Sequence, residues 1–111
     1  MANVIVIAAA SGIGHATAEG LRAVGHQVFT TARTSEKITP DAILDATDFE
    51  AVDAAFEQAS AAMGSIDGVV NCAGSLLLKA AHLTTRAQYQ SVIDASLTTA
   101  FATVRAAGKL M

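Results

Sequence analysis

The chain contains few of the residues that cross-link or interrupt a polypeptide. Its 111 residues include one cysteine, one proline, one tyrosine and no tryptophan. Because Cys72 has no second cysteine to pair with, an internal disulfide is excluded, which fits a reducing compartment. No apolar run approaches the ~20 residues that a bilayer-spanning helix needs. The seven Lys and Arg are scattered singly among ten Asp and Glu, for a net charge of -3. This balance argues against nucleic acid and against an anionic membrane surface as partners.

The remaining composition, 52% hydrophobic and 15% charged, is that of an ordinary α/β protein with one domain over residues 1–111. The apolar start, residues 4–10, could be read as a signal peptide that ends in an Ala-x-Ala site. However, no positive residue precedes it and the run is short for that purpose. A strand that leads into a glycine turn explains it better. The cytoplasm is therefore the expected location.

Strand and helix patterns follow one another along the chain, with a loop in place of a helix between the second and third strands. Residues 3–8 are apolar on both faces, as in a strand buried in a parallel sheet. Further strands are expected at 27–31, 42–45 and 66–71, with a polar loop at 34–41. The first helix is expected to open at Ser11-Gly12-Ile13-Gly14. The other two are expected to begin at the capping residues Thr47 and Thr85, with Glu50 completing a capping box at Thr47. Gly25 and Gly64 end the first two, and the third continues to the end of the chain.

Each predicted helix carries apolar residues at helical spacing. They are Ile13, Ala16, Gly20, Leu21 and Val24 in the first helix; Phe49, Val52, Phe56, Ala59 and Met63 in the second; and Tyr89, Val92, Ile93, Leu97, Ala100, Phe101 and Val104 in the third. Strand–helix alternation at this spacing means right-handed βαβ units. The predicted fold is a three-layer α/β Rossmann-type parallel sheet of four strands, in the order 3-2-1-4. Its ligand crevice opens between strands one and four, at their carboxyl ends.

The loop after the first strand suits a phosphate. Ser11, Gly12, Ile13 and Gly14 can offer backbone N–H groups to a pyrophosphate at the start of a helix. Glycines at any tight strand–helix turn look similar, so this motif alone is weak. Its place between a hydrophobic strand and an amphipathic helix favours the phosphate site.

The loop after the second strand bears on the choice of cofactor. An acidic residue at this point would bind the ribose hydroxyls of NAD and repel a 2′-phosphate. The chain instead has Ala32, followed by Arg33. A charged hydrogen bond from Arg33 to a 2′-phosphate is worth ~1.5–3 kcal/mol, which favours NADP, with NAD as the other possibility. The alternative is that Arg33 is simply a solvated surface residue.

Two further loops lead into the same crevice. Asp45, followed by Ala46, is placed to accept a hydrogen bond from an adenine amino group. The alternative is that it is simply a strand-end or helix-capping aspartate. Asn71-Cys72-Ala73-Gly74 is a turn of small residues that would let a sugar lie close to the backbone.

Taken together, these residues resemble the short-chain dehydrogenase/reductase family. Residues 8–14 look like its Gly-x-x-x-Gly-x-Gly turn, Asp45 matches its adenine-contacting aspartate, and residues 71–74 match its Asn-Asn-Ala-Gly motif. The stretch 75–101 also looks like the family segment that follows. The resemblance implies an NAD(P) cofactor, a carbonyl or alcohol substrate for a complete enzyme, and a cytoplasmic homo-oligomer. The implied cofactor-binding residues are Ser11, Gly12, Ile13, Gly14, Arg33, Asp45, Ala46, Asn71, Ala73 and Gly74.

Three residues depart from the family pattern. Ala8 stands at the usual first glycine, where its methyl group is expected to crowd the turn or the cofactor. Ile7 stands where a threonine is common, so a hydrogen bond that ties the turn is lost. Ser96 stands where the family often has an asparagine that orders a proton relay. As a mid-helix serine, Ser96 is expected to bond the Val92 carbonyl instead.

The largest departure is a missing pair. The family reaction uses a tyrosine as acid and base, with a lysine four residues later, whereas Tyr89 has Ile93 at that spacing. The family serine that orients the substrate carbonyl and two or three strands are also missing, so the fourth strand is expected to be an unpaired edge. The chain alone is therefore expected to be inactive, and no catalytic residue is assigned beyond the weak candidate Ser96. Tyr89 is expected to be a packing residue of its helix.

No metal site is expected. His15, His26 and His82 lie far apart in sequence without partners at metal-ligand spacing, and Cys72 is read as a packing residue. Three readings of the chain stay open: the cofactor-binding part of an oxidoreductase, a non-catalytic NAD(P)-binding or sensing module whose final helix docks on a partner, and a truncated record of a longer product. A Tyr-x-x-x-Lys about forty residues beyond Met111 would distinguish them.

Overall fold

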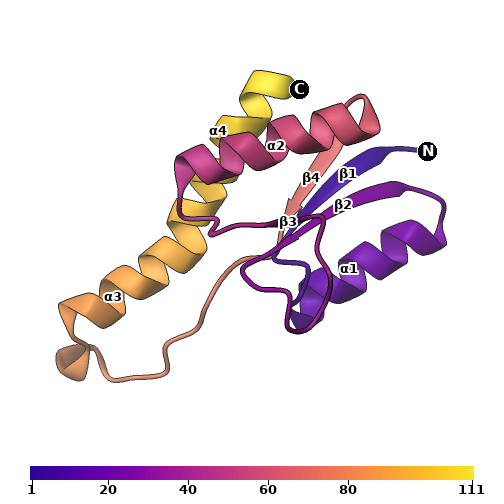
Figure 1. Ribbon diagram of the computed structural model, residues 1–111. Coiled ribbons are helices and arrows are strands. Elements are labelled where there is room, and N and C mark those ends of the chain that lie inside the picture. The colour runs from indigo at the N-terminus through magenta and orange to yellow at the C-terminus, as the bar shows by residue number, and fades with distance from the viewer.

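Four parallel strands form the centre of the computed structural model, which describes residues 1–111. They are β1 (Asn3–Ile7), β2 (Gln27–Ala32), β3 (Ala42–Ile43) and β4 (Gly68–Asn71), hydrogen-bonded in the order β3-β2-β1-β4 (Figure 1). The predicted strand order is thus confirmed. β3 and β4 are shorter than expected, each by two residues. β4 has a partner on one side only and ends the sheet.

Helices cover both faces of this sheet. α1 (Gly12–Ala23) packs on one face, and α2 (Phe49–Met63) and α4 (Thr99–Leu110) pack on the other. The alternation of side chains along β1 separates two cores, because Ile5 and Ile7 point toward α2 and α4 whereas Val4 and Val6 point toward α1. The three-layer α/β architecture is confirmed. None of these helices has both the length and the apolar content that spanning a membrane requires.

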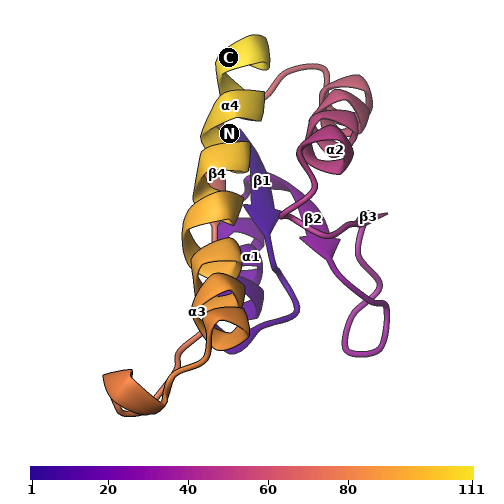
Figure 2. The ribbon, with the colours of Figure 1, turned by 90° about the vertical axis from the view of Figure 1, so that its left-hand side faces the viewer.

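The last helical segment is one long rod with an irregularity in its middle. It consists of α3 (Arg86–Ile93), a π-helical turn (Asp94–Thr98) and α4, and its α3 end extends beyond the sheet (Figures 1 and 2). A short 3₁₀ turn (Ala81–Leu83) precedes it. The predicted cap is confirmed: the Thr85 hydroxyl accepts from the Gln88 N–H at 3.2 Å, and Gln88 completes a capping box. The predicted helix is therefore present, with an unpredicted π turn.

The start of α2 differs from the expected capping box. Asp48, not Thr47, is the N-cap, and its carboxylate accepts from the N–H groups of Glu50 and Ala51. The Thr47 hydroxyl is already used, because it donates to Asp45 Oδ1 at 2.7 Å. Both residues can cap, and the contact with Asp45 decides between them. The predicted end of α2 at Gly64 is confirmed, with a φ of 88° there.

The residues predicted to form the buried face are buried in only one of the three helices. The α2 face is confirmed, since Val52, Phe56 and Ala59 are fully buried. The faces of the other two helices are wrong. α1 buries only Gly14 and Ala18 and leaves Ile13 77% exposed; the remaining members of its predicted face are exposed or half-buried.

On α4, small residues face the protein and larger apolar residues face outward. The buried positions are Thr99, Ala102, Thr103 and Ala106. The larger apolar residues are well exposed, at 58% for Tyr89, 62% for Leu97, 58% for Phe101 and 70% for Val104. Small side chains allow the helix to approach β4 and α2 closely, which explains the choice of face. The packing role predicted for Tyr89 is therefore wrong.

An ionic and aromatic cluster joins α2 to α4 at the edge of this face. Asp53 Oδ2 accepts from Arg105 Nη1 at 2.8 Å and from Lys109 Nζ at 2.9 Å. The Arg105 guanidinium lies 5.4 Å from the centre of the Phe49 ring, which is 5.7 Å from that of Phe101. The hydrogen bonds from Lys109 and then Arg105 lower the pKa of Asp53 below its usual value.

Candidate functional site

A cavity of about 1190 Å³ opens at the carboxyl ends of the strands. It lies where the strand order predicted a crevice, with Ile7 and Ala8 after β1 on one wall and Cys72 to Gly74 after β4 on another. Of the ten residues proposed from the sequence, six line it: Ser11, Arg33, Asp45, Ala46, Ala73 and Gly74. Gly12, Ile13, Gly14 and Asn71 do not line it, although each belongs to a loop or helix end that does. The structure thus brings all four predicted loops to one cavity.

The first loop is a tight turn that presents the start of α1. Ser11 is the N-cap, and its hydroxyl accepts from the Gly14 N–H at 3.1 Å and donates to the Ala8 carbonyl at 2.9 Å. The N–H groups of Gly12 and Ile13 come too early in the helix to have an intrahelical acceptor. They are the donors left for an anion at this end, where the helix dipole also favours negative charge.

Two close approaches fix the shape of this turn. A Cβ at Gly14 would overlap the carbonyl oxygen of Ala8, so only glycine fits at Gly14. Ala8 itself has a φ of 62°, the only positive φ among the non-glycine residues. The crowding predicted at Ala8 therefore takes the form of a left-handed backbone, which glycine adopts more readily. The neighbouring Ile7 side chain is buried in the core at 1% exposure, so it makes no polar tie to the turn.

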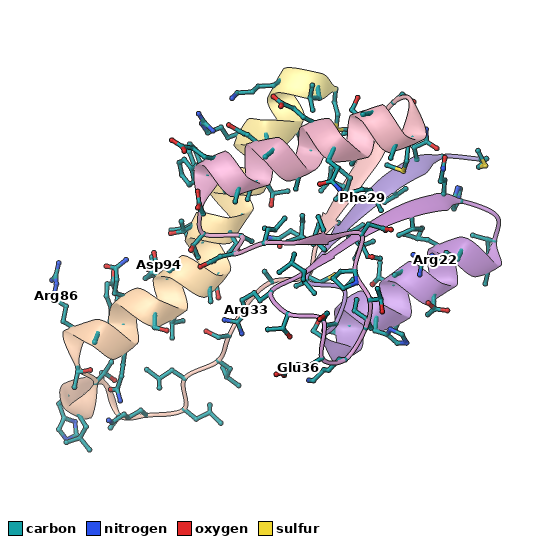
Figure 3. The ribbon with its side chains drawn as sticks, in the orientation of Figure 1. Arg22, Phe29, Arg33, Glu36, Arg86 and Asp94 are labelled. Atoms are coloured by element: carbon teal, nitrogen blue, oxygen red, sulfur yellow. The ribbon has the colours of Figure 1, made fainter.

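The second loop places charged residues at the outer part of the cavity. Arg33, Glu36 and Lys37 all line it. Neither Arg33 nor Lys37 forms an ion pair within the chain. Figure 3 shows Arg33 on the side of the loop that faces the long helix, with Glu36 at its far end. Arg33 is thus free to meet an anionic ligand group, and Glu36 adds a negative charge that the sequence analysis did not consider.

In the third loop, Asp45 is held in its ionised form. The Thr47 N–H donates to its Oδ1 at 2.9 Å and the Thr47 hydroxyl at 2.7 Å. These bonds, and more weakly the charge of Arg33, lower the pKa of Asp45 below its usual value. Asp45 does not cap α2, because Asp48 does so. Its carboxylate remains exposed at the cavity wall and can accept a further hydrogen bond.

The fourth loop is stabilised by its own asparagine and by the long helix. Asn71 Oδ1 accepts from the Ala73 N–H at 3.0 Å. The Ser75 N–H donates to Ser96 Oγ at 3.4 Å. The expected bond from Ser96 to the Val92 carbonyl is absent, because the π turn directs Ser96 toward this loop instead. Cys72 is half-buried among the apolar residues on the α1 side and also lines the cavity.

The long helix contributes a cavity wall that the sequence analysis missed. Its lining residues are Ala87, Gln90, Ser91, Asp94, Ala95 and Thr99. They run through α3 and the π turn, and helical periodicity alone does not indicate a π turn. A continued α-helix would have placed these side chains elsewhere, so the sequence pattern carried no signal for them.

The cavity contains no tyrosine–lysine pair. Tyr89 is exposed, does not line the cavity, and has Ile93 four residues later. No group of three or more His, Cys, Asp or Glu side chains lies close enough together to hold a metal ion. The arrangement provides phosphate donors, a cation and hydrogen-bond acceptors, which are features of a nucleotide-binding crevice of the Rossmann type.

Comparisons with known proteins agree with this class. The family model described as short chain dehydrogenase matches residues 2–111. A curated relative, the 3-oxoacyl-[acyl-carrier-protein] reductase MabA of Mycobacterium avium, is 36% identical over 98% of this chain. Among solved structures, a short chain dehydrogenase from Mycobacterium smegmatis has a TM-score of 0.91 at 27% identity over 98% of this chain. The aldohexose dehydrogenase of Thermoplasma acidophilum has a TM-score of 0.90 at 26% identity over 99% of it.

The chain belongs to the short-chain dehydrogenase family. It spans 44% of the length of the M. avium relative, 44% of the T. acidophilum enzyme and 51% of the M. smegmatis protein.

Proposed function

We propose that residues 1–111 form the NADP-preferring, dinucleotide-binding part of an oxidoreductase that acts on carbonyl or alcohol substrates. The observation that carries this proposal is the convergence of four loops on one cavity, each with residues suited to a different part of a dinucleotide. The family uses NAD(P), so the residues present must be tested against that ligand.

They fit it at two points, and the size of the cavity is compatible with it. Gly12 and Ile13 offer free N–H groups to the pyrophosphate at the start of α1, next to the cavity. The ionised carboxylate of Asp45 can accept from the adenine amino group. The cavity volume, about 1190 Å³, suits a ligand of this size.

The preference for NADP rests on Arg33. Its guanidinium lines the cavity without a partner, and no acidic residue occupies position 32. A charged hydrogen bond of ~1.5–3 kcal/mol corresponds to a roughly ten- to hundredfold preference for a 2′-phosphate. Glu36, on the same loop, opposes this preference by repulsion, so we expect the lower part of that range.

Bound NADP(H) supplies a hydride at the nicotinamide ring, which in a complete enzyme passes to or from a carbonyl carbon. The residues of this chain hold and orient the dinucleotide but provide no positioned acid for the carbonyl oxygen, since Tyr89 lies outside the cavity. The name of the M. avium relative describes reduction of a 3-oxo group, which supports a carbonyl substrate for the complete enzyme. We place that enzyme in the cytoplasm as a homo-oligomer.

The homo-oligomer has a candidate surface, the outward face of the long helix, defined as Tyr89, Leu97, Phe101 and Val104. These four side chains are 58–70% exposed, which is unusual for apolar residues in a row on one helix. The same face also favours a second candidate function, a non-catalytic NAD(P)-binding module that docks on a different partner. Sedimentation of the purified chain separates the two, since only the first predicts self-association.

Binding and turnover should separate in this chain. We expect titration to give measurable binding of NADPH, because all four loops lie within residues 8–74. We expect no carbonyl-dependent oxidation of NADPH across a panel of ketones and aldehydes, because a positioned acid is worth about 10²–10⁴-fold. Absence of dinucleotide binding would refute the proposal. Carbonyl-dependent turnover that Tyr89→Phe abolishes would show that the chemistry was assigned to the wrong residues.

A further inference from the structure

The loop after β4 is tied at two points to the long helix, once in the π turn and once at the first residue of α4. Asn71 Nδ2 donates to Thr99 Oγ1 at 3.5 Å, and the Ser75 N–H donates to Ser96 Oγ at 3.4 Å. Ser96 lies within the π turn, and Thr99 is the residue whose N–H closes it on the Asp94 carbonyl. The π turn thus acts as the support of the loop Asn71–Ser75.

Thr99 is the buried member of this connection. It is 3% exposed, and its hydroxyl donates to the Ala95 carbonyl at 2.8 Å. A hydroxyl has one proton, so Thr99 Oγ1 can only accept from Asn71. It therefore requires the amide nitrogen of Asn71, not the oxygen, on its side.

This requirement fixes the orientation of Asn71. With Nδ2 toward Thr99, Oδ1 points to the Ala73 N–H and accepts from it at 3.0 Å. If the amide were flipped, Asn71 Oδ1 would face Thr99 Oγ1, which are both acceptors, and Asn71 Nδ2 would face the Ala73 N–H, which are both donors. Both hydrogen bonds would then be lost. The orientation of Asn71 in turn holds the backbone of Ala73, which lines the cavity.

The strand order indicates which part of the ligand this loop meets. Arg33 and Asp45, which suit the adenosine half, follow β2 and β3, and the phosphate donors of α1 follow β1. The remaining nucleoside of a dinucleotide then falls over the next strand, β4, and its loop.

We propose that Thr99 is a positioning residue, which acts through Asn71 to hold the Ala73–Gly74 backbone against the nucleoside on the far side of the pyrophosphate. The inference rests on the proposed function, because it assumes that the cavity binds a dinucleotide. It predicts that loss of the Thr99 hydroxyl weakens binding of the whole dinucleotide and spares ligands that contain only the adenosine half.

Three variants test this role. Thr99→Val removes the hydroxyl at nearly constant volume, and Thr99→Ser keeps it. Thr103→Val makes the same change one turn later, at a residue that is also buried and bonds only the Thr99 carbonyl at 2.8 Å. Titration with NADPH should give about 3- to 10-fold weaker binding for Thr99→Val, with affinity close to wild type for the other two. Adenosine 2′,5′-bisphosphate should bind all four proteins alike.

Nuclear magnetic resonance gives a second readout that needs no ligand. The side-chain amide protons of Asn71 should exchange slowly with solvent in the wild type, Thr99→Ser and Thr103→Val, and should exchange faster in Thr99→Val. Equal NADPH affinity in wild type and Thr99→Val would overturn the proposal, as would an equal loss in Thr103→Val. If Thr99→Val does not fold, fast solvent exchange of the Asn71 side-chain amide protons in the wild type would overturn it instead.

The two proposals can fail separately. A wild-type chain that binds no dinucleotide refutes the proposed function and, with it, the ligand contact of this loop. Asn71 resonances that do not respond to Thr99→Val refute the role of Thr99 whatever the chain binds.

Discussion

Replacing Ala8 with glycine removes a methyl group from a residue with a φ of 62°. The left-handed region costs a non-glycine residue about 1–2 kcal/mol, because Cβ comes too close to the following carbonyl oxygen. Glycine avoids that cost but loses about 0.5–1 kcal/mol through the greater freedom of the unfolded chain. The difference predicts that Ala8→Gly raises the free energy of unfolding by roughly 0.5–1 kcal/mol.

The expected change is measurable in a domain of this size. For 111 residues, that gain corresponds to a rise in Tm of roughly 2–4 °C. Urea unfolding followed by circular dichroism should give a higher midpoint with an unchanged slope. The bonds from the Ser11 N–H and hydroxyl to the Ala8 carbonyl involve only the backbone of Ala8, so they should persist.

Ala10→Gly is the matched control. Ala10 lies in the same turn but has no positive φ, so glycine there should lower stability by about 0.5–1 kcal/mol. The reasoning would be refuted if Ala8→Gly lowered the midpoint as much as Ala10→Gly does. In that case, the methyl group of Ala8 would stabilise the turn by more than its left-handed backbone costs.

Three further predictions concern charge and surface. Arg33→Ala should lower the ratio of NADPH to NADH affinity about tenfold and leave NADH binding unchanged. The control is Arg86→Ala, at an exposed arginine on α3, which should alter neither affinity. If Arg33→Ala left the ratio unchanged, Arg33 would be a surface residue only. Val104→Asp should abolish self-association in sedimentation velocity. The control is Val24→Asp, at a similarly exposed valine at the end of α1, which should not. If both variants dissociate the chain, or neither does, the outward face is not the surface through which it self-associates. The lowered pKa of Asp53 means that its ion pairs stabilise the fold fully above the ordinary value of 3.8 and lose this effect as the pH falls through the lower folded-state value. Asp53→Asn should therefore lower stability at pH 7 and reduce the loss of stability as the pH falls below 3.8. A pH dependence identical to wild type would contradict the role of these ion pairs.

The sheet could be predicted from the sequence because its determinants are local. Residues 4–7 are apolar on both faces, and spacing alone implied a helix after the first and third strands. The same holds for α2, where the large residues Val52 and Phe56 mark the buried face without ambiguity. Strand order, helix positions and the location of the cavity all followed from these signals.

The helix faces of α1 and α4 could not be predicted in this way. Apolar periodicity weights large side chains, whereas these helices lie close to the sheet through Ala18, Ala102 and Ala106. Thr99 and Thr103 are buried as well, with hydroxyls satisfied by carbonyls one turn earlier. Close packing selected small residues, and the larger ones remained on the outside.

The parts of the candidate site that depend on residues within one loop could be predicted. The parts that depend on contacts between distant elements could not. Arg33 and Asp45 line the cavity as expected from their positions after strands. Asp48 replaced Thr47 as the cap only because Thr47 bonds Asp45. The contributions of Asp94 and Thr99 to the cavity wall depend on the π turn, which no local sequence pattern indicated.

The π turn also sets how the long helix can tolerate insertions and deletions. The Thr99 N–H bonds the Asp94 carbonyl five residues back, so this turn contains one residue more than an α-helix would. Deleting one residue between 94 and 98 would restore a regular α-helix and leave α3 in nearly the same rotation relative to α4, because the five residues of the π turn cover about one turn, as four do in an α-helix. Gln90 and Asp94 would then stay at the cavity wall, and Ala102 and Ala106 would keep their contacts with the core. If the present sequence were instead wound as a regular α-helix, α3 would rotate by about 100° relative to α4 and these two side chains would leave the wall. The extra residue in this short segment therefore keeps the wall that faces the ligand aligned with the buried face of α4.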